Sequence, residues 1–423
     1  MGNGVPVRLT LSSSGGNSRA ARRSCARRPT NRASRERRSP LVPSPPGGLV
    51  LQPLVVGLGR SGSGLHLRTL ARLARRTAAT GAPLLALPVV GCDPRAEARG
   101  SAGAPGELTA VGTLDEALAR IDPETTVAHV CTPPRLRYDV IARLAGHGVR
   151  RLIVEKPLAP SAGELDALVR LRERADLDMV VVSHWTGSRL AGRLRRLVRD
   201  EALGPLRRIT VDQHKPRFLR SLTTDGHPTA LDVEIPHSLA LALDLAGPAE
   251  LRAARCWDLR CEDRVLPGLG GAHVELAHPS GVTTLLRSDL GAAVRQRSVV
   301  CAFEGGTATA HFPLSEDDDH AQLIVHGPDS EAGHHVFRDD ALTDFLEGAY
   351  RGFAAGTAGA VNFALACATA RLLCVARERC AVVPRPDTVL PSTAVAPTAV
   401  APTAVAATPV PAPGVPQAHA GSR

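Results

Sequence analysis

The chain of 423 residues is 43% hydrophobic but only 3% aromatic, which allows a mostly aliphatic core and two or three domains. Its formal net charge of +10 comes almost entirely from the first 50 residues, and residues 51–384 carry no net charge. A neutral body with few aromatic residues lacks the electrostatic footprint of a nucleic-acid-binding protein. We therefore expect no nucleic-acid partner.

The cysteines and the apolar runs exclude further classes of protein. Nine cysteines are scattered without a Cys-x-x-Cys pair, and no apolar run reaches the roughly 18 residues of a membrane helix. We expect reduced thiols, no metal site, no membrane partner and a cytoplasmic location. The basic residues are almost all arginine, since the sequence contains two lysines, Lys156 and Lys215. This bias is typical of a GC-rich bacterial genome.

Both ends of the chain are expected to be disordered. Residues 1–48 are rich in Arg, Ser, Gly and Pro, a composition that cannot bury enough apolar surface to fold alone. Residues 385–423 include the repeat TAVAPTAVAPTAVAA, and Ala-Pro repeats favour extended, unpacked chain. A transit peptide or an over-extended start remains open for the first segment.

From residue 49, short apolar runs alternate with capped amphipathic segments. Alternation at this spacing implies right-handed crossovers and a parallel sheet. The pattern predicts an α/β Rossmann domain over 49–178. Its strands are expected within 53–59, 85–93, 125–134 and 149–157, and its helices at 65–79, 113–121, 137–148 and 161–175.

After about residue 180, strand-like runs follow one another and are separated by turn signals such as HPSG and EGG. This predicts an α+β domain over 179–384 with a largely antiparallel open sheet and few helices between strands. The expected strands are 206–214, 252–260, 271–278, 282–290, 298–304, 307–312 and 322–326, and two helices at 339–355 and 361–379 close the body.

The segment VVGLGRSGSGLH (55–66) places several glycines between the first strand and the first helix. Gly57 permits a tight turn, Gly59 lets the backbone approach a pyrophosphate, and Gly62 allows close helix–strand packing. The helix N-terminus supplies amide donors and a partial positive charge. We therefore expect dinucleotide binding at Gly57, Gly59, Arg60, Ser61 and Gly62.

The second strand ends in an acid, Asp93, which completes the dinucleotide fingerprint. Its carboxylate would accept hydrogen bonds from a ribose diol and repel a 2′-phosphate. This favours NAD, while Arg95 two residues later leaves NADP open.

A second signature, VEKPLA (154–159), ends a later strand. Together with the glycine loop and CTPP (131–134), it resembles the glucose–fructose oxidoreductase / inositol dehydrogenase (Gfo/Idh/MocA) family. Glu155 stands 98 residues after Gly57, a spacing typical of the family. The resemblance covers about 54–383 and implies an NAD(P)-dependent oxidoreductase that forms a homo-dimer or tetramer.

The resemblance also implies roles for single residues. Lys156 would be the catalytic lysine, with Glu155 holding it in place. Pro157 would fix the turn, with a cis Lys–Pro bond in many members of the family. Thr132 and Pro133 would lie beside the nicotinamide, and His66 is a typical residue after the glycine loop.

The family's third motif is an acid followed four residues later by a histidine. In DVEIPHS, His237 matches the histidine, but Asp232 lies five residues before it and Glu234 three. Glu234 would share a helix face with His237 if the helix already included it. Pro236 instead suggests that the helix starts there, so the partner of His237 stays open.

Oxidation of an alcohol removes a hydride, which the nicotinamide accepts, and a proton. A lysine can hold the developing alkoxide and exchange protons once burial lowers its pKa, which an arginine cannot do. The proton could then pass from Lys156 to His237, with Glu234 or Asp232 orienting the ring.

Several other polar residues are also considered for the site. His184 and Trp185 are explained equally well as pocket lining or as packing at a strand end. In DQHKPRF, His214, Lys215 and Arg217 follow a strand that should border the site. His334, His335 and the acidic run 316–320 are expected at the surface.

These expectations converge on an NAD(P)-dependent oxidoreductase acting on a hydroxyl or keto carbon of a sugar, cyclitol or amino or phospho derivative. Aminosugar or aminocyclitol antibiotic biosynthesis is one setting. The alternative is a catalytically decayed, dinucleotide-sensing regulatory protein. The substrate and the reaction direction stay open.

Overall fold

The computed structural model describes residues 49–102, 106–223, 227–315, 318–328 and 333–385. The expected N-terminal arm lies outside the described residues, as does the expected C-terminal tail beyond Arg385.

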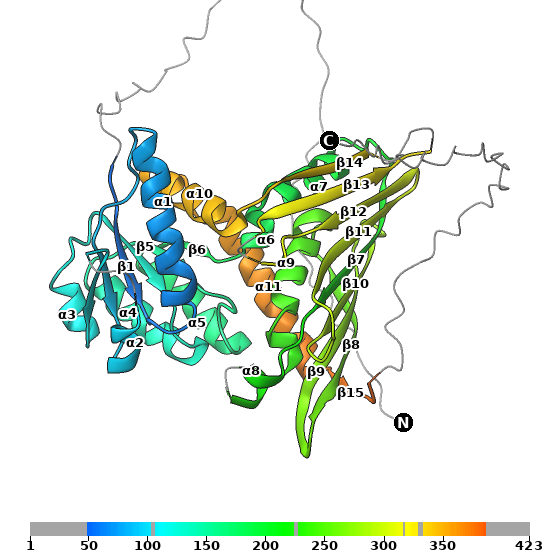
Figure 1. Ribbon diagram of the computed structural model, residues 1–423, viewed down its shortest axis with the longest axis horizontal. Coiled ribbons are helices and arrows are strands. Elements are labelled where there is room, and N and C mark those ends of the chain that lie inside the picture. The colour runs from blue at the N-terminus through cyan, green and yellow to red at the C-terminus, as the bar shows by residue number, and fades with distance from the viewer. Residues whose placement is uncertain (1–48, 103–105, 224–226, 316–317, 329–332, 386–423) are drawn as a thin grey trace, which may run out of the picture. The chain divides into compact units, whose positions relative to one another are not determined.

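The first part of the described chain is a six-stranded, wholly parallel sheet with the order β3-β2-β1-β4-β5-β6 (Figure 1). Its strands are β1 (Gln52–Val56), β2 (Val89–Cys92), β3 (Leu108–Val111), β4 (Thr126–Val130), β5 (Arg151–Val154) and β6 (Asp178–Val181). Its helical segments are η1 (Gly62–Leu67), α1 (Arg68–Ala79), α2 (Ala96–Gly100), α3 (Leu114–Leu118), η2 (Pro134–Leu136), α4 (Arg137–Gly146) and α5 (Ala162–Arg174). This is the predicted Rossmann arrangement. Strand β6 crosses the boundary expected at residue 178, so the parallel sheet ends at Val181.

The second sheet has nine strands in the order β14-β13-β12-β11-β7-β10-β9-β8-β15. They are β7 (Leu206–His214), β8 (Glu250–Cys261), β9 (Arg264–Ala277), β10 (Thr283–Asp289), β11 (Gln296–Phe303), β12 (Gly306–His311), β13 (His320–His326), β14 (Gly333–Arg338) and β15 (Ala381–Val382). The β7–β10 and β8–β15 pairs are parallel and the other neighbours are antiparallel. The predicted fold class, a Rossmann domain followed by a largely antiparallel sheet, is confirmed.

Helices of the second part cover one face of this sheet and reach back to the first (Figure 1). They are α6 (His184–Gly187), α7 (Arg189–Arg199), α8 (Phe218–Thr223), η3 (Ala230–Asp232), α9 (Ile235–Ala246), α10 (Ala341–Ala355) and α11 (Ala360–Glu378). Helix α9 packs on β7 and β10 on one side and on α11 on the other, and α11 also contacts β6 and α5. A helix that is apolar on nearly every face, as IPHSLALALDLA is, must be covered on all sides.

Helices α10 and α11 connect the Rossmann domain to the second sheet. Helix α10 packs against α1, and α11 crosses from β6 to β8. The start of α9 therefore lies beside the segment that follows β5, which contains Lys156: the Lys156 Nζ donates to the Val233 carbonyl at 3.1 Å.

Candidate active site

The glycine loop between β1 and α1 is tightly folded against the end of β4. Gly57 has a φ of +95°, and a Cβ there would lie 3.0 Å from the Cys131 carbonyl carbon. A Cβ on Gly62 would lie 1.9 Å from the Gly57 oxygen, so the helix can begin there only with glycine. At Gly59 the nearest atom to a Cβ is the mobile end of Arg95, at 3.3 Å. The loop therefore leaves its Gly59 side open to a close backbone approach, as a bound pyrophosphate requires.

The acid at the end of β2 is already engaged. Asp93 is 2% exposed. Its Oδ2 accepts from the Leu58 amide and from Arg95 Nη2, both at 2.9 Å, and its Oδ1 accepts from Arg95 Nε at 3.0 Å. Burial opposes ionisation, but the hydrogen bonds from Arg95 and Leu58 hold the pKa of Asp93 below its ordinary value. The forked pairing neutralises the carboxylate and leaves the Arg95 guanidinium at the loop surface.

Glu155 ties the glycine loop to the segment after β5. Ser61 Oγ donates to Glu155 Oε1 at 2.6 Å, and His66 Nε2 lies 3.0 Å from the same oxygen. The other oxygen, Oε2, accepts from the Lys156 amide at 3.1 Å. Burial alone would raise the pKa of Glu155, but hydrogen bonds from His66 and Ser61 lower it to about 2. The carboxylate is therefore a fixed anion between the cofactor loop and Lys156.

Behind Glu155 runs a buried chain of polar groups. His66 Nδ1 lies 2.7 Å from His129 Nδ1, and His129 Nε2 lies 2.9 Å from the Tyr350 hydroxyl on α10. Burial would lower the pKa of His66, but Cys131 and Glu155 raise it to about 10, whereas burial and the His66 charge lower that of His129. A protonated His66 then donates to Glu155 and to a neutral His129. Sequence reasoning missed both His129 and Tyr350: the only signal for His129 was a polar residue inside a buried strand, and Tyr350 lies on a distant helix.

Lys156 is held in a position where its ammonium is easily deprotonated. Its pKa is lowered, first by burial and then by the charges of Arg220, Arg137 and Arg217, while Glu155 opposes the shift. A lysine whose pKa is lowered gives up its proton more readily than an exposed lysine does.

Arg137 fixes the turn that carries Lys156. Its side chain is 2% exposed and donates to three carbonyls, with Nε reaching Thr132 at 3.1 Å, Nη2 reaching Lys156 at 3.5 Å and Nη1 in contact with Pro157. The Lys156–Pro157 bond is cis, as the family resemblance implied. Sequence reasoning did not identify Arg137, because most of the arginines that the structure describes are exposed.

His237 lies in the first turn of α9 and is packed between rings. Its ring centroid is 4.5 Å from that of His184 and 6.3 Å from that of Trp185. Burial and the neighbouring Lys156 charge lower its pKa well below the ordinary value. The ring is therefore neutral near pH 7, and His184 and Trp185 serve as its packing surface.

Neither acid before His237 pairs with its ring among the contacts of the described residues. Glu234 contacts Lys215 and Gln213 through both carboxylate oxygens. Asp232 caps its own turn by accepting from Thr229 and receives Arg377 Nε at 2.8 Å. The expectation that one of them orients His237 is thus corrected, because α9 starts only at Ile235 and both carboxylates precede it on turns that face other elements.

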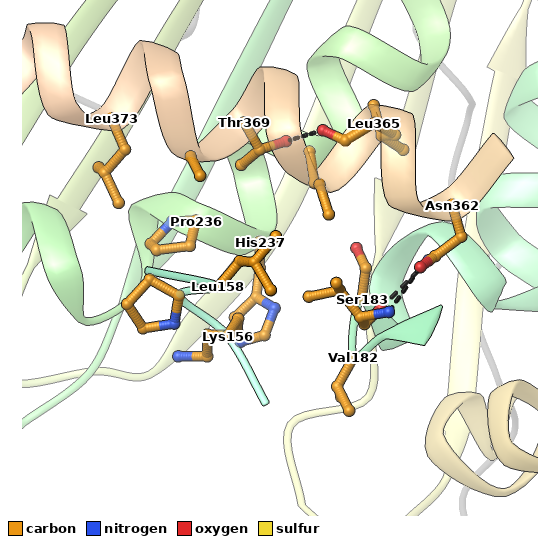
Figure 2. Close-up of a pocket in the computed structure, with 15 residues that line it drawn as sticks. Lys156, Leu158, Val182, Ser183, Pro236, His237, Asn362, Leu365, Thr369 and Leu373 are labelled. Atoms are coloured by element: carbon orange, nitrogen blue, oxygen red, sulfur yellow. Dashed lines mark hydrogen bonds between the residues drawn. The ribbon is translucent and has the colours of Figure 1, made fainter. Parts of the chain in front are cut away.

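Lys156 and His237 also line a small apolar cavity of about 30 Å³ (Figure 2). Helix α11 contributes Leu365, Thr369 and Leu373 to the lining of the same cavity. Asn362 at the start of α11 exchanges two hydrogen bonds with the Val181 backbone and so ties α11 to the end of β6.

The remaining expected residues fall into two groups. Thr132 and Pro133 follow β4 directly, and the buried Thr132 hydroxyl has no hydrogen-bond partner in the structure, so it is available where the nicotinamide is expected. Arg60 is exposed on the glycine loop. His334 and His335 lie exposed on β14, as expected. Within the described residues no group of three or more His, Cys, Asp or Glu side chains is arranged to hold a metal ion.

Comparison with known families agrees with this geometry. Residues 51–184 match the model of the oxidoreductase family with an NAD-binding Rossmann fold. Over these residues the chain has an NAD-binding Rossmann domain of the Gfo/Idh/MocA oxidoreductase type. The predicted family and cofactor class are confirmed, and the chain is an NAD(P)-dependent oxidoreductase. A comparison with curated protein sequences finds no match.

Solved structures share the fold at low sequence identity. KijD10, a 3-ketoreductase from Actinomadura kijaniata solved with NADP and TDP-benzene, is 15% identical with a TM-score of 0.66, covering 80% of this chain and 100% of its own. An oxidoreductase from Agrobacterium radiobacter, solved with NAD+, L-tartaric acid and magnesium, is 16% identical with a TM-score of 0.62, covering 78% and 96%. An NAD-binding oxidoreductase from Klebsiella pneumoniae is 16% identical with a TM-score of 0.64, covering 78% and 98%.

The glycine loop, the open side at Gly59 and the unpaired Thr132 hydroxyl fit a nicotinamide dinucleotide.

In the part of the chain that the structure describes, no helix is long and apolar enough to cross a membrane. The eight described cysteines are free thiols.

Proposed function

We propose that this oxidoreductase interconverts a hydroxyl and a keto group on a sugar or cyclitol, with Lys156 as the catalytic residue. One observation carries the proposal: a single carboxylate, Glu155, accepts from Ser61 of the cofactor loop and from the Lys156 amide. Glu155 thereby fixes the position of Lys156 relative to the loop that would bind the hydride carrier. Such positioning accounts for a large part of enzymatic rate enhancement.

The dinucleotide, when bound, supplies the hydride acceptor or donor. The protein must then hold the substrate oxygen and move one proton. The Lys156 ammonium can donate to that oxygen, and its lowered pKa allows it to give up the proton or take it back. His237, kept neutral by burial, is proposed as a second hydrogen-bond partner of the substrate.

Glu234 is proposed to act on the site through Lys215. Burial and the charge of Lys156 lower the pKa of Lys215, while the contacting Glu234 carboxylate acts in the opposite direction. Asp232 is assigned a structural role, because Thr229 and Arg377 occupy it.

The substrate class and the setting rest on two supports. KijD10, with the same fold, is a 3-ketoreductase solved with TDP-benzene and NADP. The arginine-rich, lysine-poor composition fits the GC-rich bacteria expected from the sequence. We propose a sugar or aminocyclitol substrate in antibiotic biosynthesis, a cytoplasmic location and a homo-oligomer that pairs through the open face of the nine-stranded sheet. Light scattering of the purified chain measures the oligomeric state.

A parallel titration of the full chain with NADH and NADPH, followed by reduced-nicotinamide fluorescence, tests the cofactor site. Gly59→Trp should abolish binding, because the indole fills the open side of the loop. A screen of nucleotide-linked ketosugars and keto-cyclitols then tests the activity. Binding of neither cofactor at millimolar concentration would overturn the function, and cofactor binding without turnover of any substrate would favour the sensor alternative.

A further inference from the structure

Arg217, on the segment between β7 and α8, is an unusual arginine. Its residue is 5% exposed, and its backbone amide is fixed to the Leu290 carbonyl at 2.9 Å. The side chain makes one hydrogen bond, from Nη1 to the Ser221 hydroxyl at 3.0 Å, and its buried Nε has no partner. No carboxylate of the described residues pairs with it.

Three other arginines with largely buried side chains, Arg137, Arg287 and Arg377, have several acceptors or a carboxylate partner. Arg287 forks onto Asp212 at 2.5 and 2.7 Å, and Arg377 pairs with Asp232. Arg137 donates to three carbonyl oxygens. Burying a cation without a counter-ion costs several kcal/mol of folding free energy. The stability of the fold therefore does not explain the presence of Arg217, and a ligand can.

More positive charge gathers around Arg217. The pKa of Arg217 falls to about 10, first because of burial and then because of the Arg220 and Arg60 charges. Arg60 belongs to the cofactor loop, whereas Arg220 lies on α8. Glu155 and Glu234, the acids of the site, are already engaged by His66 and Lys215. No carboxylate of the described residues therefore neutralises Arg217 before a ligand binds.

The charge of Arg217 acts on the reacting end of the site. It lowers the pKa of Lys156, of Lys215 and of His227. The adenosine end of the cofactor loop has its own arginine, Arg95, which is paired with Asp93. An anion beside Arg217 thus lies close to the transferred group rather than beside the adenosine.

We propose that Arg217, with Arg60 and Arg220, forms a subsite for a phosphate or diphosphate group carried by the substrate. Guanidinium groups offer several donors in a planar fork, which match the acceptor oxygens of a phosphate. The inference rests on the proposed oxidoreductase function and narrows its substrate to a phosphorylated or nucleotide-linked sugar or cyclitol.

The test uses the full chain saturated with NADPH, so that the cofactor's own pyrophosphate site is filled. Calorimetry with inorganic pyrophosphate as the probe should show binding that Arg217→Met weakens by about tenfold to a hundredfold, the range of charge-assisted hydrogen bonds. Arg208→Gln, an exposed arginine of β7, is the matched control and should bind as the wild type does. NADPH affinity should change little in either variant.

Arg217→Met should fold, since it removes an uncompensated buried cation, and its melting temperature should equal or exceed that of the wild type. Arg217→Lys keeps the charge and should give an intermediate pyrophosphate affinity. Equal pyrophosphate binding by wild type and Arg217→Met, or no binding by the NADPH-saturated wild type, would overturn the subsite while leaving cofactor binding intact. A parallel loss of NADPH affinity in Arg217→Met would assign Arg217 to the cofactor's pyrophosphate and overturn the subsite. Failure of the wild type to bind either NADPH or NADH would instead remove the proposed function.

Discussion

His66 and Glu155 form a buried ion pair, with Nε2 and Oε1 3.0 Å apart, directly beneath the glycine loop. Both side chains are nearly inaccessible, and each stabilises the charged form of the other. Glu155 directly precedes Lys156 in the sequence. His66 contacts His129, which in turn contacts the Tyr350 hydroxyl on α10. The pair therefore connects the Lys156 segment to helix α10 of the second part of the chain through hydrogen bonds.

The stability of this pair should depend on pH in a defined window. The pKa of His66 is raised to about 10, so its contribution is complete below its ordinary pKa of 6.5 and is lost as pH rises through about 10. The pKa of Glu155 is lowered to about 2, so its contribution is complete above 4.5 and is lost as pH falls through about 2. The full effect is therefore present between about pH 4.5 and 6.5.

Glu155→Gln should lower the free energy of unfolding by about 3–5 kcal/mol near pH 6, because it leaves the His66 cation buried alone. The difference from the wild type should shrink as the pH rises from 6.5 through about 10, because His66 in the wild type loses its proton through about pH 10. Urea unfolding at several pH values measures it, and Glu164→Gln on the exposed start of α5 is the control. A difference that does not vary between pH 6 and pH 10 would contradict the protonated state of His66.

Lys156→Met should separate chemistry from cofactor binding. The variant should lose turnover by about 10²–10⁴-fold, the usual contribution of a general acid–base group, because methionine fills the space without a proton to exchange. NADPH affinity should change little, since the glycine loop is intact. Stopped-flow reduction and fluorescence titration measure the two quantities, and turnover near the wild-type level would exclude Lys156 as the catalytic residue.

Motifs and periodicity in the sequence correctly predicted the local features of the Rossmann domain and several strands of the second sheet. The β1–glycine loop–α1 unit, Asp93 at the end of β2 and the Glu155–Lys156–Pro157 turn are local features, and the structure has them where the sequence placed them. Strand β7 was expected at 206–214 and is found at Leu206–His214. Short-range patterns suffice here because each feature depends on a few neighbouring residues.

Contacts between distant segments were not readable from the sequence. Helix α7 was missed because five arginines in RLAGRLRRLVR hide the apolar face formed by Leu190, Ala191 and Leu194. The His129–Tyr350 contact joins residues 221 positions apart, and the Asp232–Arg377 pair 145. Spacing rules for one helix could not identify the partners of Asp232, because its partner lies on another helix.

The two acids before His237 should respond differently to amidation. Asp232→Asn breaks the buried pair with Arg377 and should lower the free energy of unfolding by about 3–5 kcal/mol, with little change in the pH profile of turnover. Glu234→Gln removes the carboxylate that opposes deprotonation of Lys215, so the pKa of Lys215 should fall further. Any limb of the pH–rate profile that belongs to Lys215 should then move to lower pH.

Unfolding curves and pH–rate profiles of both variants distinguish these roles. A displaced pH–rate profile in Asp232→Asn, with unchanged stability, would return Asp232 to the catalytic group. A stability loss alone in Glu234→Gln would make Glu234 structural.

Arg95 should decide the choice between the two dinucleotides. Its guanidinium neutralises Asp93, removing the repulsion that a free carboxylate would exert on a 2′-phosphate, and its side chain is 62% exposed at the loop. We therefore expect the wild type to bind NADPH, and Arg95→Ala to weaken that binding by about tenfold to a hundredfold while NADH binding holds or improves. Arg75→Ala, an exposed arginine of α1 beside Glu107, is the control. Fluorescence titration with both cofactors gives the ratio directly. An equal loss for NADH and NADPH would place Arg95 on the pyrophosphate, and Asp93 would then keep the ribose-binding role that favours NAD.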